Sequence, residues 1–426
     1  MKNLFIAFLA LLNCHLLAQP HANPLRMEER IKKLGTFGAN PEGGVSRVAF
    51  SDADLQGRAY VISLMKNAGL EVSIDAAGNI IGKRKGKNND LPVIAFGSHI
   101  DSVPNGGNYD GDVGSVGAIE CIELLNEGKI QTNHPLEVII FEDEEGGLTG
   151  SEAIAGILAS NKLDHLSHSG KTIRQGIQLL GGDPEKLASA ARKKGSLHAF
   201  LELHIEQGGI LFREGTQIGV VEGIVGINQW KVTAEGKANH AGTTPMNQRQ
   251  DALLASSRLV VSINEAATSI QGRQVATVGK IMAWPGAPNV IPGKTEFMLE
   301  IRDLSHDRIM EVFSKVRSRA EEISKASGVS FRFDLLNENF PALTDKNVQQ
   351  TIAAAAKELN YSNKFMPSGA GHDTQDMARI APTGMIFIPS KDGISHSPYE
   401  YSTAEDMARG VDVLLHSILK LDLSGK

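Results

Sequence analysis

The sequence is poor in cysteine and has no extended basic tract. Only two cysteines, Cys14 and Cys121, occur among 426 residues, and the formal net charge is -6. Because Cys14 falls within a predicted leader, a mature chain would keep one cysteine and form no intrachain disulfide. The clusters of lysine and arginine are short, which argues against a nucleic-acid partner. The composition is that of a globular protein long enough for two domains.

Long hydrophobic runs are also missing, except near the start. Lys2 is followed by the apolar stretch 4–12 and by a small residue at position 18. This stretch is too short to span a membrane, and its layout is typical of a secretory signal peptide. We therefore predict that residues 1–18 are a signal peptide, that the protein is exported to the periplasm, and that it has no membrane span. Lipid attachment at Cys14 is disfavoured, because Asn13 stands where lipoprotein signals have a small residue.

The chain does contain short apolar runs that end in possible metal ligands. The run 92–96 is typical of a buried strand, and it is followed by His99, Asp101 and Asp110. Open α/β sheets bind ligands at the carboxyl ends of their strands. His99 offers an imidazole nitrogen, Asp110 offers two oxygens that could bridge two ions, and Asp101 is placed to orient His99. The alternative is a polar loop with an incidental histidine.

A second apolar run, 136–141, ends in four consecutive acids, Glu142–Glu145. Such acids repel one another unless cations neutralise them. We expect an extended chain here, in which neighbouring side chains point in opposite directions. Glu144 and Glu145 are therefore expected to differ in role, one acting on metal and one on water.

Two further apolar runs are associated with one histidine each. His204 lies in the run 200–208, and His396 follows the run 385–389 in a loop. A histidine in a strand, such as His204, is more often a core residue. Two other strands already end in ligand-type residues, however, which favours a ligand role for His204. Segments with helical spacing separate the runs, which predicts an α/β fold with a doubly wound or mixed sheet. No Gly-x-Ser-x-Gly elbow, phosphate-binding loop or dinucleotide fingerprint occurs.

The segment from about 215 to 334 has a different character. Its order of strand, helix, strand, strand, helix and strand predicts an inserted α+β unit of ferredoxin-like type. The catalytic domain is then expected to consist of 25–214 and 335–426, with 215–334 as a lid over its cleft. The segment contains His240, Asn289 and Arg302, each of which could have only a structural role. An arginine at the end of a strand could also bind a carboxylate through two hydrogen bonds.

These motifs resemble the di-zinc amidohydrolases that include N-carbamoyl-L-amino-acid hydrolases, allantoate amidohydrolases and β-ureidopropionases, within the metallopeptidase clan of aminoacylases and carboxypeptidases. The resemblance extends from about Arg26 onward and is carried by 97–103, 109–111, 144–146, 202–208, 368–373 and 393–397. It implies two divalent ions per chain, zinc or alternatively manganese, cobalt or nickel, held by His99, Asp110, Glu145, His204 and His396. It also implies a homodimer formed through the inserted domain.

The resemblance further implies that Glu144 is the general base and that Asp101 supports His99. His240 would stabilise the oxyanion, and the substrate would be held by Gln207, His240, Asn289 and Arg302. The expected reaction is hydrolysis of a linear, non-peptide C–N bond in a small carboxylated substrate, first an N-carbamoyl-L-amino acid and alternatively allantoate. Two competing hypotheses are an aminoacylase or exopeptidase, and a periplasmic binding protein with an inactive metal site. Such a binding protein has no need of a base at Glu144.

Overall fold

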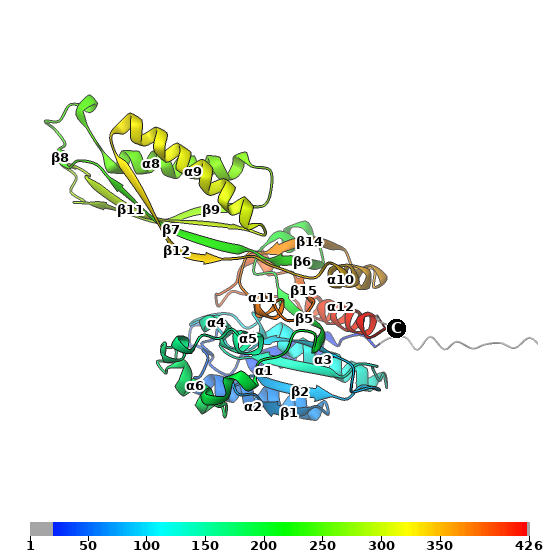
Figure 1. Cartoon of the computed structure of the whole chain (residues 1–426). Coiled ribbons are helices and arrows are strands. Elements are labelled where there is room, and N and C mark those ends of the chain that lie inside the picture. The colour runs from blue at the N-terminus through cyan, green and yellow to red at the C-terminus, as the bar shows by residue number, and fades with distance from the viewer. Residues whose placement is uncertain (1–19, 424–426) are drawn as a thin grey trace, which may run out of the picture.

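The computed structural model describes residues 20–423 of the chain (Figure 1). The predicted signal peptide, 1–18, and Cys14 lie outside the described residues. The described part contains a nine-stranded sheet, a four-stranded sheet and a two-stranded sheet. The four-stranded sheet projects away from the nine-stranded one, as Figure 1 shows. Within residues 20–423, no helix has the length and apolar character needed to cross a membrane.

The nine-stranded sheet is mixed, with the order β1-β2-β4-β3-β5-β15-β6-β13 and with β14 also paired to β6. Its four central strands are parallel neighbours, so their carboxyl ends meet at one edge. These four strands are those that the apolar runs predicted. The strands of this sheet are β1 (Glu71–Ile74), β2 (Ile80–Arg84), β3 (Val93–His99), β4 (Leu136–Phe141), β5 (Leu197–Ile205), β6 (Ile218–Ile224), β13 (Ala342–Leu343), β14 (Asn363–Ser368) and β15 (Thr383–Ile388).

Helices bury both faces of this sheet, which explains why its central strands are apolar throughout. Ile94 and Phe96 of β3 belong to the core shared with α1, α3 and α12, whereas Ala95 belongs to the core on the other face. The helices outside the four-stranded sheet are α1 (Pro24–Leu34), α2 (Asp52–Asn67), α3 (Asp112–Glu127), α4 (Glu144–Gly147), α5 (Thr149–Ala155), α6 (Ile173–Leu179), α7 (Ile210–Glu214), α10 (Lys346–Glu358), α11 (Thr374–Met377) and α12 (Ala404–Leu423). Short 3₁₀ turns are η1 (Ser160–Asp164), η2 (Pro184–Ser189), η3 (Met246–Gln248) and η4 (Lys391–Gly393).

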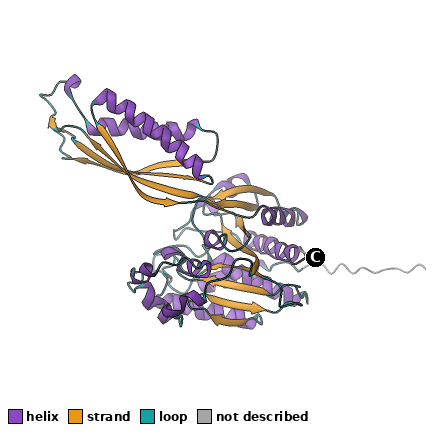
Figure 2. Cartoon of the chain, viewed as in Figure 1, coloured by secondary structure: helices purple, strands orange, loops and turns teal. Residues whose placement is uncertain are grey.

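The four-stranded sheet is antiparallel and has the order β12-β7-β11-β9. Numbered along the chain this is 4-1-3-2, with one helix after the first strand and one after the third, which is the arrangement of the split βαβ motif. Figure 2 shows both helices along one side of this sheet. Its elements are β7 (Gly226–Glu235), α8 (Ala252–Ser269), β9 (Val275–Trp284), β11 (Lys294–Asp303), α9 (His306–Ser327) and β12 (Ser330–Asn339).

The bounds of this unit differ from the expected segment 215–334. The first strand after Gly215, β6, pairs within the nine-stranded sheet, and β12 continues to Asn339. The two-stranded sheet, β8 (Asn239–His240) and β10 (Val290–Ile291), lies at the end of the four-stranded unit that is farther from the nine-stranded sheet (Figure 1).

Candidate metal centre and active site

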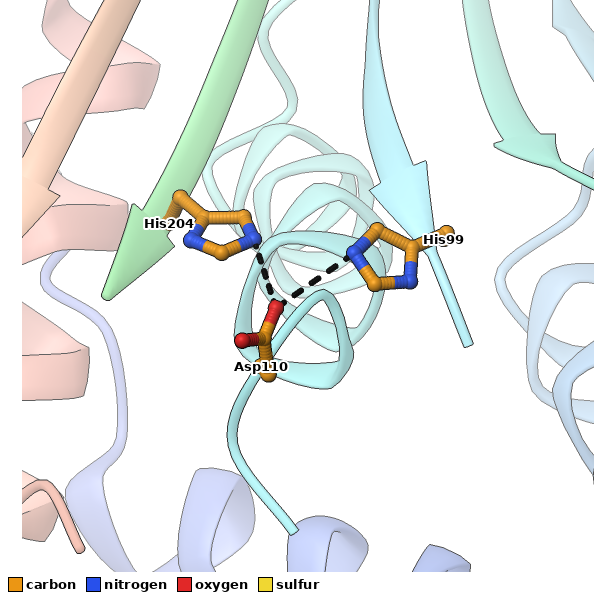
Figure 3. Close-up of side chains that lie close together, drawn as sticks. All are labelled: His99, Asp110 and His204. Atoms are coloured by element: carbon orange, nitrogen blue, oxygen red, sulfur yellow. Dashed lines mark ion pairs between the residues drawn. The ribbon is translucent and has the colours of Figure 1, made fainter. Parts of the chain in front are cut away.

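The carboxylate of Asp110 lies between three histidines at the carboxyl edge of the large sheet. Its Oδ1 is 3.1 Å from Nε2 of His204 and 3.5 Å from Nε2 of His99 (Figure 3). Its Oδ2 is 3.4 Å from Nε2 of His396, which in turn is 3.3 Å from Oε1 of Glu145. Asp110 therefore belongs to two groups of possible ligands, an inner group with His99 and His204 and an outer group with Glu145 and His396.

The distances between these ligand atoms are those expected if each group binds one divalent ion. Two ligand atoms bound at about 2.0–2.1 Å to a tetrahedral ion lie about 3.3 Å apart, which is close to the observed distances. In the described part of the chain, Nε2 of His99 and Oε1 of Glu145 are buried without a hydrogen-bond partner. Buried polar atoms are almost always paired, so unpaired atoms that converge on Asp110 are suited to bind cations.

The imidazoles of the inner group are oriented by the main chain. Nδ1 of His99 donates to the carbonyl of Asp101 at 3.0 Å, and Nδ1 of His204 donates to the carbonyl of Ile205 at 2.9 Å. A carbonyl only accepts, so the proton is on Nδ1 and the lone pair of Nε2 faces Asp110. The backbone N–H of Gly111 donates to Nε2 of His204 at 3.2 Å, which fits the same tautomer.

Asp101 has a second contact that the sequence did not indicate. Its carboxylate lies 3.6 Å from Nδ1 of His99, beyond hydrogen-bond distance. Instead, its two oxygens accept the backbone N–H groups of Glu144 at 3.2 Å and Glu145 at 3.1 Å. Asp101 thus orients His99 through its carbonyl and positions the two glutamates through its carboxylate.

The expectation of an extended chain at the acidic run is wrong. Asp143 has a positive φ of 59°, and Glu144 begins the helical turn α4. Successive helical residues point about 100° apart, so the two glutamates still separate: Glu145 joins His396, whereas Oε2 of Glu144 is 3.8 Å from Nε2 of His99. Burial raises the pKa of the Glu144 carboxyl well above its usual value, and the charge of Glu145 adds to the rise, although His99 opposes it.

The other two acids of the run face away from the metal ligands. Glu142 is buried and forms an ion pair with the buried side chain of Arg58. Asp143 accepts a hydrogen bond from Oγ1 of Thr149 at 2.5 Å. Burial raises the pKa of both carboxyls, that of Asp143 to about 7. Only half of the acidic run therefore contacts the expected metal ligands.

A cleft of about 560 Å³ is lined by residues of the four-stranded sheet and of the segments 206–210 and 366–370, among them Gln207, Arg302 and Gly369. Nε2 of Gln207 donates to Oδ2 of Asp110 at 2.6 Å. Arg302 donates from Nη1 to the carbonyl of Gly369 at 2.7 Å and from Nε to Oε1 of Glu300 at 2.6 Å. The structure thus brings two of the four expected substrate residues to one cleft.

The other two expected substrate residues, His240 and Asn289, are not brought to this cleft. Both are exposed; His240 belongs to β8 and Asn289 directly precedes β10, and this strand pair lies away from the nine-stranded sheet of the same chain (Figure 1). Nδ1 of His240 accepts the backbone N–H groups of Gly242 at 3.0 Å and Thr243 at 3.2 Å. In this arrangement His240 cannot contact a substrate held at Asp110.

Sequence reasoning missed Ser395 and Glu400 and gave no role to His372. Ser395 Oγ is 3.0 Å from Oδ2 of Asp110 and 2.8 Å from Oε2 of Glu400. The ring of His372 packs edge-on against His204, with 4.5 Å between centroids, and burial lowers its pKa well below the usual value. The only sequence signal for the first two was proximity to His396, because their contacts with Tyr109 and Asp110 join parts of the chain that are far apart in sequence.

Residues 95–420 match the sequence profile of the family described as peptidase family M20/M25/M40. The chain belongs to this family. An N-carbamoyl-L-amino acid amidohydrolase of Geobacillus stearothermophilus is 42% identical over 401 residues, which cover 93% of this chain and 98% of that protein. A ureidoglycolate hydrolase of Arabidopsis thaliana is 41% identical over 410 residues, covering 93% of this chain and 86% of that one.

A solved structure has the same fold over nearly the whole chain. The crystal structure of a hydantoinase/carbamoylase family amidase from Burkholderia multivorans gives a TM-score of 0.88 at 34% identity, covering 94% of this chain and 98% of that one. The protein is therefore an enzyme of this family, a hydrolase that acts on C–N bonds other than peptide bonds. This excludes the hypothesis of a binding protein with an inactive site.

Proposed function

We propose that the protein hydrolyses the ureido C–N bond of an N-carbamoyl-L-amino acid with two divalent metal ions, and that the products are the L-amino acid, carbon dioxide and ammonia. The observation that carries this proposal is the position of Asp110. Its carboxylate is shared by two ligand groups, and it accepts a hydrogen bond from Gln207, which lines the same cleft as Arg302. The relatives named above support the choice of substrate class.

We propose zinc as the ion at both positions. The inner group offers two imidazoles and the outer group offers one, with carboxylate oxygens and no thiolate in either. Such donors suit zinc and also accept manganese, cobalt or nickel. Two ions at such a site polarise a substrate carbonyl and lower the pKa of bound water.

Glu144 is the proposed general base. It is the member of the glutamate pair that belongs to neither ligand group, and it lies next to His99. A carboxylate in this position suits a group that accepts a proton from water and then transfers it to the leaving nitrogen. Asp101 holds the backbone of Glu144 in place during both transfers.

Arg302 is the proposed site for the α-carboxylate. In β11, Phe297, Leu299 and Ile301 are buried against the helices, whereas Arg302 lies on the opposite face and lines the cleft. A guanidinium matches a carboxylate through two parallel hydrogen bonds. Gln207 lies between this site and Asp110, where its amide can hold the substrate near the ions.

We also propose a homodimer formed through the four-stranded unit. The edge strand β9 has no partner on one side within residues 20–423, and its Val275, Ile281 and Trp284 are exposed. An unpaired edge with apolar side chains favours pairing with another chain.

His240 and Asn289 lie in this unit and would act at the metal ligands of the second copy, since they do not reach the metal ligands of their own chain. Sedimentation should give twice the chain mass, and a monomer would contradict this.

Export to the periplasm is proposed from the basic start and short apolar stretch of residues 1–18. Mass spectrometry of the protein from its native host should give a chain that begins near Gln19. A cytoplasmic protein that retains Met1 would contradict the proposal.

The substrate class is tested by ammonia release from the zinc-loaded enzyme. The panel contains N-carbamoyl-L-amino acids, their D-enantiomers, allantoate, ureidoglycolate, N-acetyl amino acids and dipeptides. We expect the highest kcat/KM for an N-carbamoyl-L-amino acid. A preference for allantoate or ureidoglycolate would change the substrate, whereas hydrolysis of only acyl or peptide bonds, measured as released amino acid, would contradict the proposed function.

A further inference from the structure

Glu400 connects the two loops that carry Asp110 and His396. It lies between β15 and α12, and its side chain is 5% exposed. Its Oε1 accepts the backbone N–H groups of Tyr109 at 2.8 Å and Asp110 at 3.0 Å. Its Oε2 is 2.8 Å from Oγ of Ser395 and accepts the backbone N–H of His396 at 3.3 Å. One carboxylate thus joins segments that are separated by 290 residues.

Neither Asp110 nor His396 lies in a helix or strand, and the first loop is tied to Val45 through Gly106, four residues before Asp110. The first loop lies between the end of β3 at His99 and the start of α3 at Asp112, and His396 lies outside any helix or strand with a φ of +52°. Backbone N–H groups need a hydrogen-bond partner, and Glu400 is the partner of three of them, in Tyr109, Asp110 and His396. The Glu400 side chain therefore links the backbones of the two loops.

Gly107 provides the space that the Glu400 side chain occupies. A Cβ at position 107 would lie 2.2 Å from Oε1 and 2.5 Å from Cβ of Glu400. The backbone of Gly107 is not in the left-handed region, so the reason for glycine here is room and not conformational freedom. A larger residue would displace the Glu400 carboxylate from both loops.

We propose that Glu400 is a positioning residue for the metal ion of the outer group, which is the second ion to bind. Glu400 sets the distance between Asp110 and His396 through the backbones of their loops. This inference rests on the proposed two-metal function. The inner group depends less on Glu400, since His99 and His204 lie on strands and have their own main-chain contacts. Loss of Glu400 therefore weakens the outer group more than the inner one.

The test is titration of the chelator-treated full chain with zinc chloride, followed by calorimetry and by elemental analysis of the dialysed protein. In Glu400→Gln one oxygen becomes an NH₂ group, which cannot accept the N–H groups on its side. Gly107→Ala perturbs the same carboxylate from the opposite direction. The matched control is Asp422→Asn, because the carboxylate of Asp422 accepts the backbone N–H groups of Asn133 and His134 far from the ligands.

We expect the wild type and Asp422→Asn to bind two ions with the same two affinities. Both Glu400→Gln and Gly107→Ala should weaken the second binding step by about 10- to 100-fold, the range typical of groups that orient metal ligands, and change the first step less. Unchanged second-step affinity in both variants would overturn the inference, as would unfolding of Glu400→Gln while Asp422→Asn stays folded. A wild type that binds fewer than two ions would instead contradict the proposed function.

Discussion

The carboxylate of Asp101 accepts a hydrogen bond from the backbone N–H of Glu144, with 3.2 Å between the atoms. The carbonyl of the same residue orients His99. One residue therefore places both an expected metal ligand and the expected base. Its position between the end of β3 and the start of α4 makes this possible, because parallel neighbouring strands bring those two ends together.

Asp101→Asn tests the link between Asp101 and Glu144. The amide keeps one oxygen but turns an NH₂ group toward one of the two backbone N–H groups, while the main-chain carbonyl that orients His99 stays. We expect kcat to fall roughly 10- to 100-fold while the metal content is retained, since an oriented base typically contributes 10²–10⁴-fold. Steady-state kinetics and elemental analysis on the same sample check this. A loss of metal with normal kcat per bound ion would contradict it.

Glu144→Gln removes the proposed base and keeps its shape. Because Glu144 lies outside both ligand groups, the variant should bind both ions as the wild type does. Its turnover should fall by on the order of 10²-fold or more, the loss expected for general-base catalysis. Glu145→Gln is the matched comparison, since it should lose metal as well. Near-normal kcat in Glu144→Gln would refute the assignment.

Arg302→Lys keeps the charge but loses the planar fork that binds both carboxylate oxygens. KM for a carboxylated substrate should rise, by an amount that corresponds to roughly 1.5–3 kcal/mol, the range for a hydrogen bond to a charged group, with metal content unchanged. The increase should shrink for the amide analogue of the same substrate. Equal losses for both substrates would mean that Arg302 only supports the structure through Gly369 and Glu300.

Asp376 gives the free energy of unfolding a pH dependence. Burial raises its pKa to about 6, above the ordinary value of 3.8. As the pH rises from about 4 to about 6 the unfolded chain loses this proton before the folded one, so the folded state is destabilised. Relative to Asp376→Asn, the wild type should lose roughly 1–3 kcal/mol over that range. Urea unfolding at several pH values measures the difference, and exposed Asp52→Asn is the control. A flat difference would contradict the expectation.

The strands at the centre could be predicted because their sequence signals are local. The apolar runs that became β3, β4, β5 and β15 are each bounded by polar or turn residues, and the parallel order then places their ends together. The order of elements in the four-stranded unit was likewise readable from alternation and helical spacing. The first and last residues of this unit could not be predicted, because β6 has the same apolar pattern whichever sheet it joins.

The contacts that complete the centre could not be predicted, since they join residues that are distant in sequence. Glu400 accepts backbone N–H groups, and such a contact leaves no motif at either end. The helical turn at Glu144 depends on the positive φ of Asp143, which a run of acids does not reveal. His240 is exposed in β8, at the far end of the projecting four-stranded unit (Figure 1), and local sequence does not encode that projection.

The most direct test of the two-metal account is recovery of ammonia release after the ions are removed. The wild type and Asp110→Ala are stripped with a chelator, titrated with zinc, and assayed with an N-carbamoyl-L-amino acid. We expect the stripped wild type to be inactive and to regain activity only as the second equivalent per chain binds, whereas Asp110→Ala should neither retain two ions nor recover. Full activity of the stripped wild type, or two retained ions in Asp110→Ala, would contradict the account.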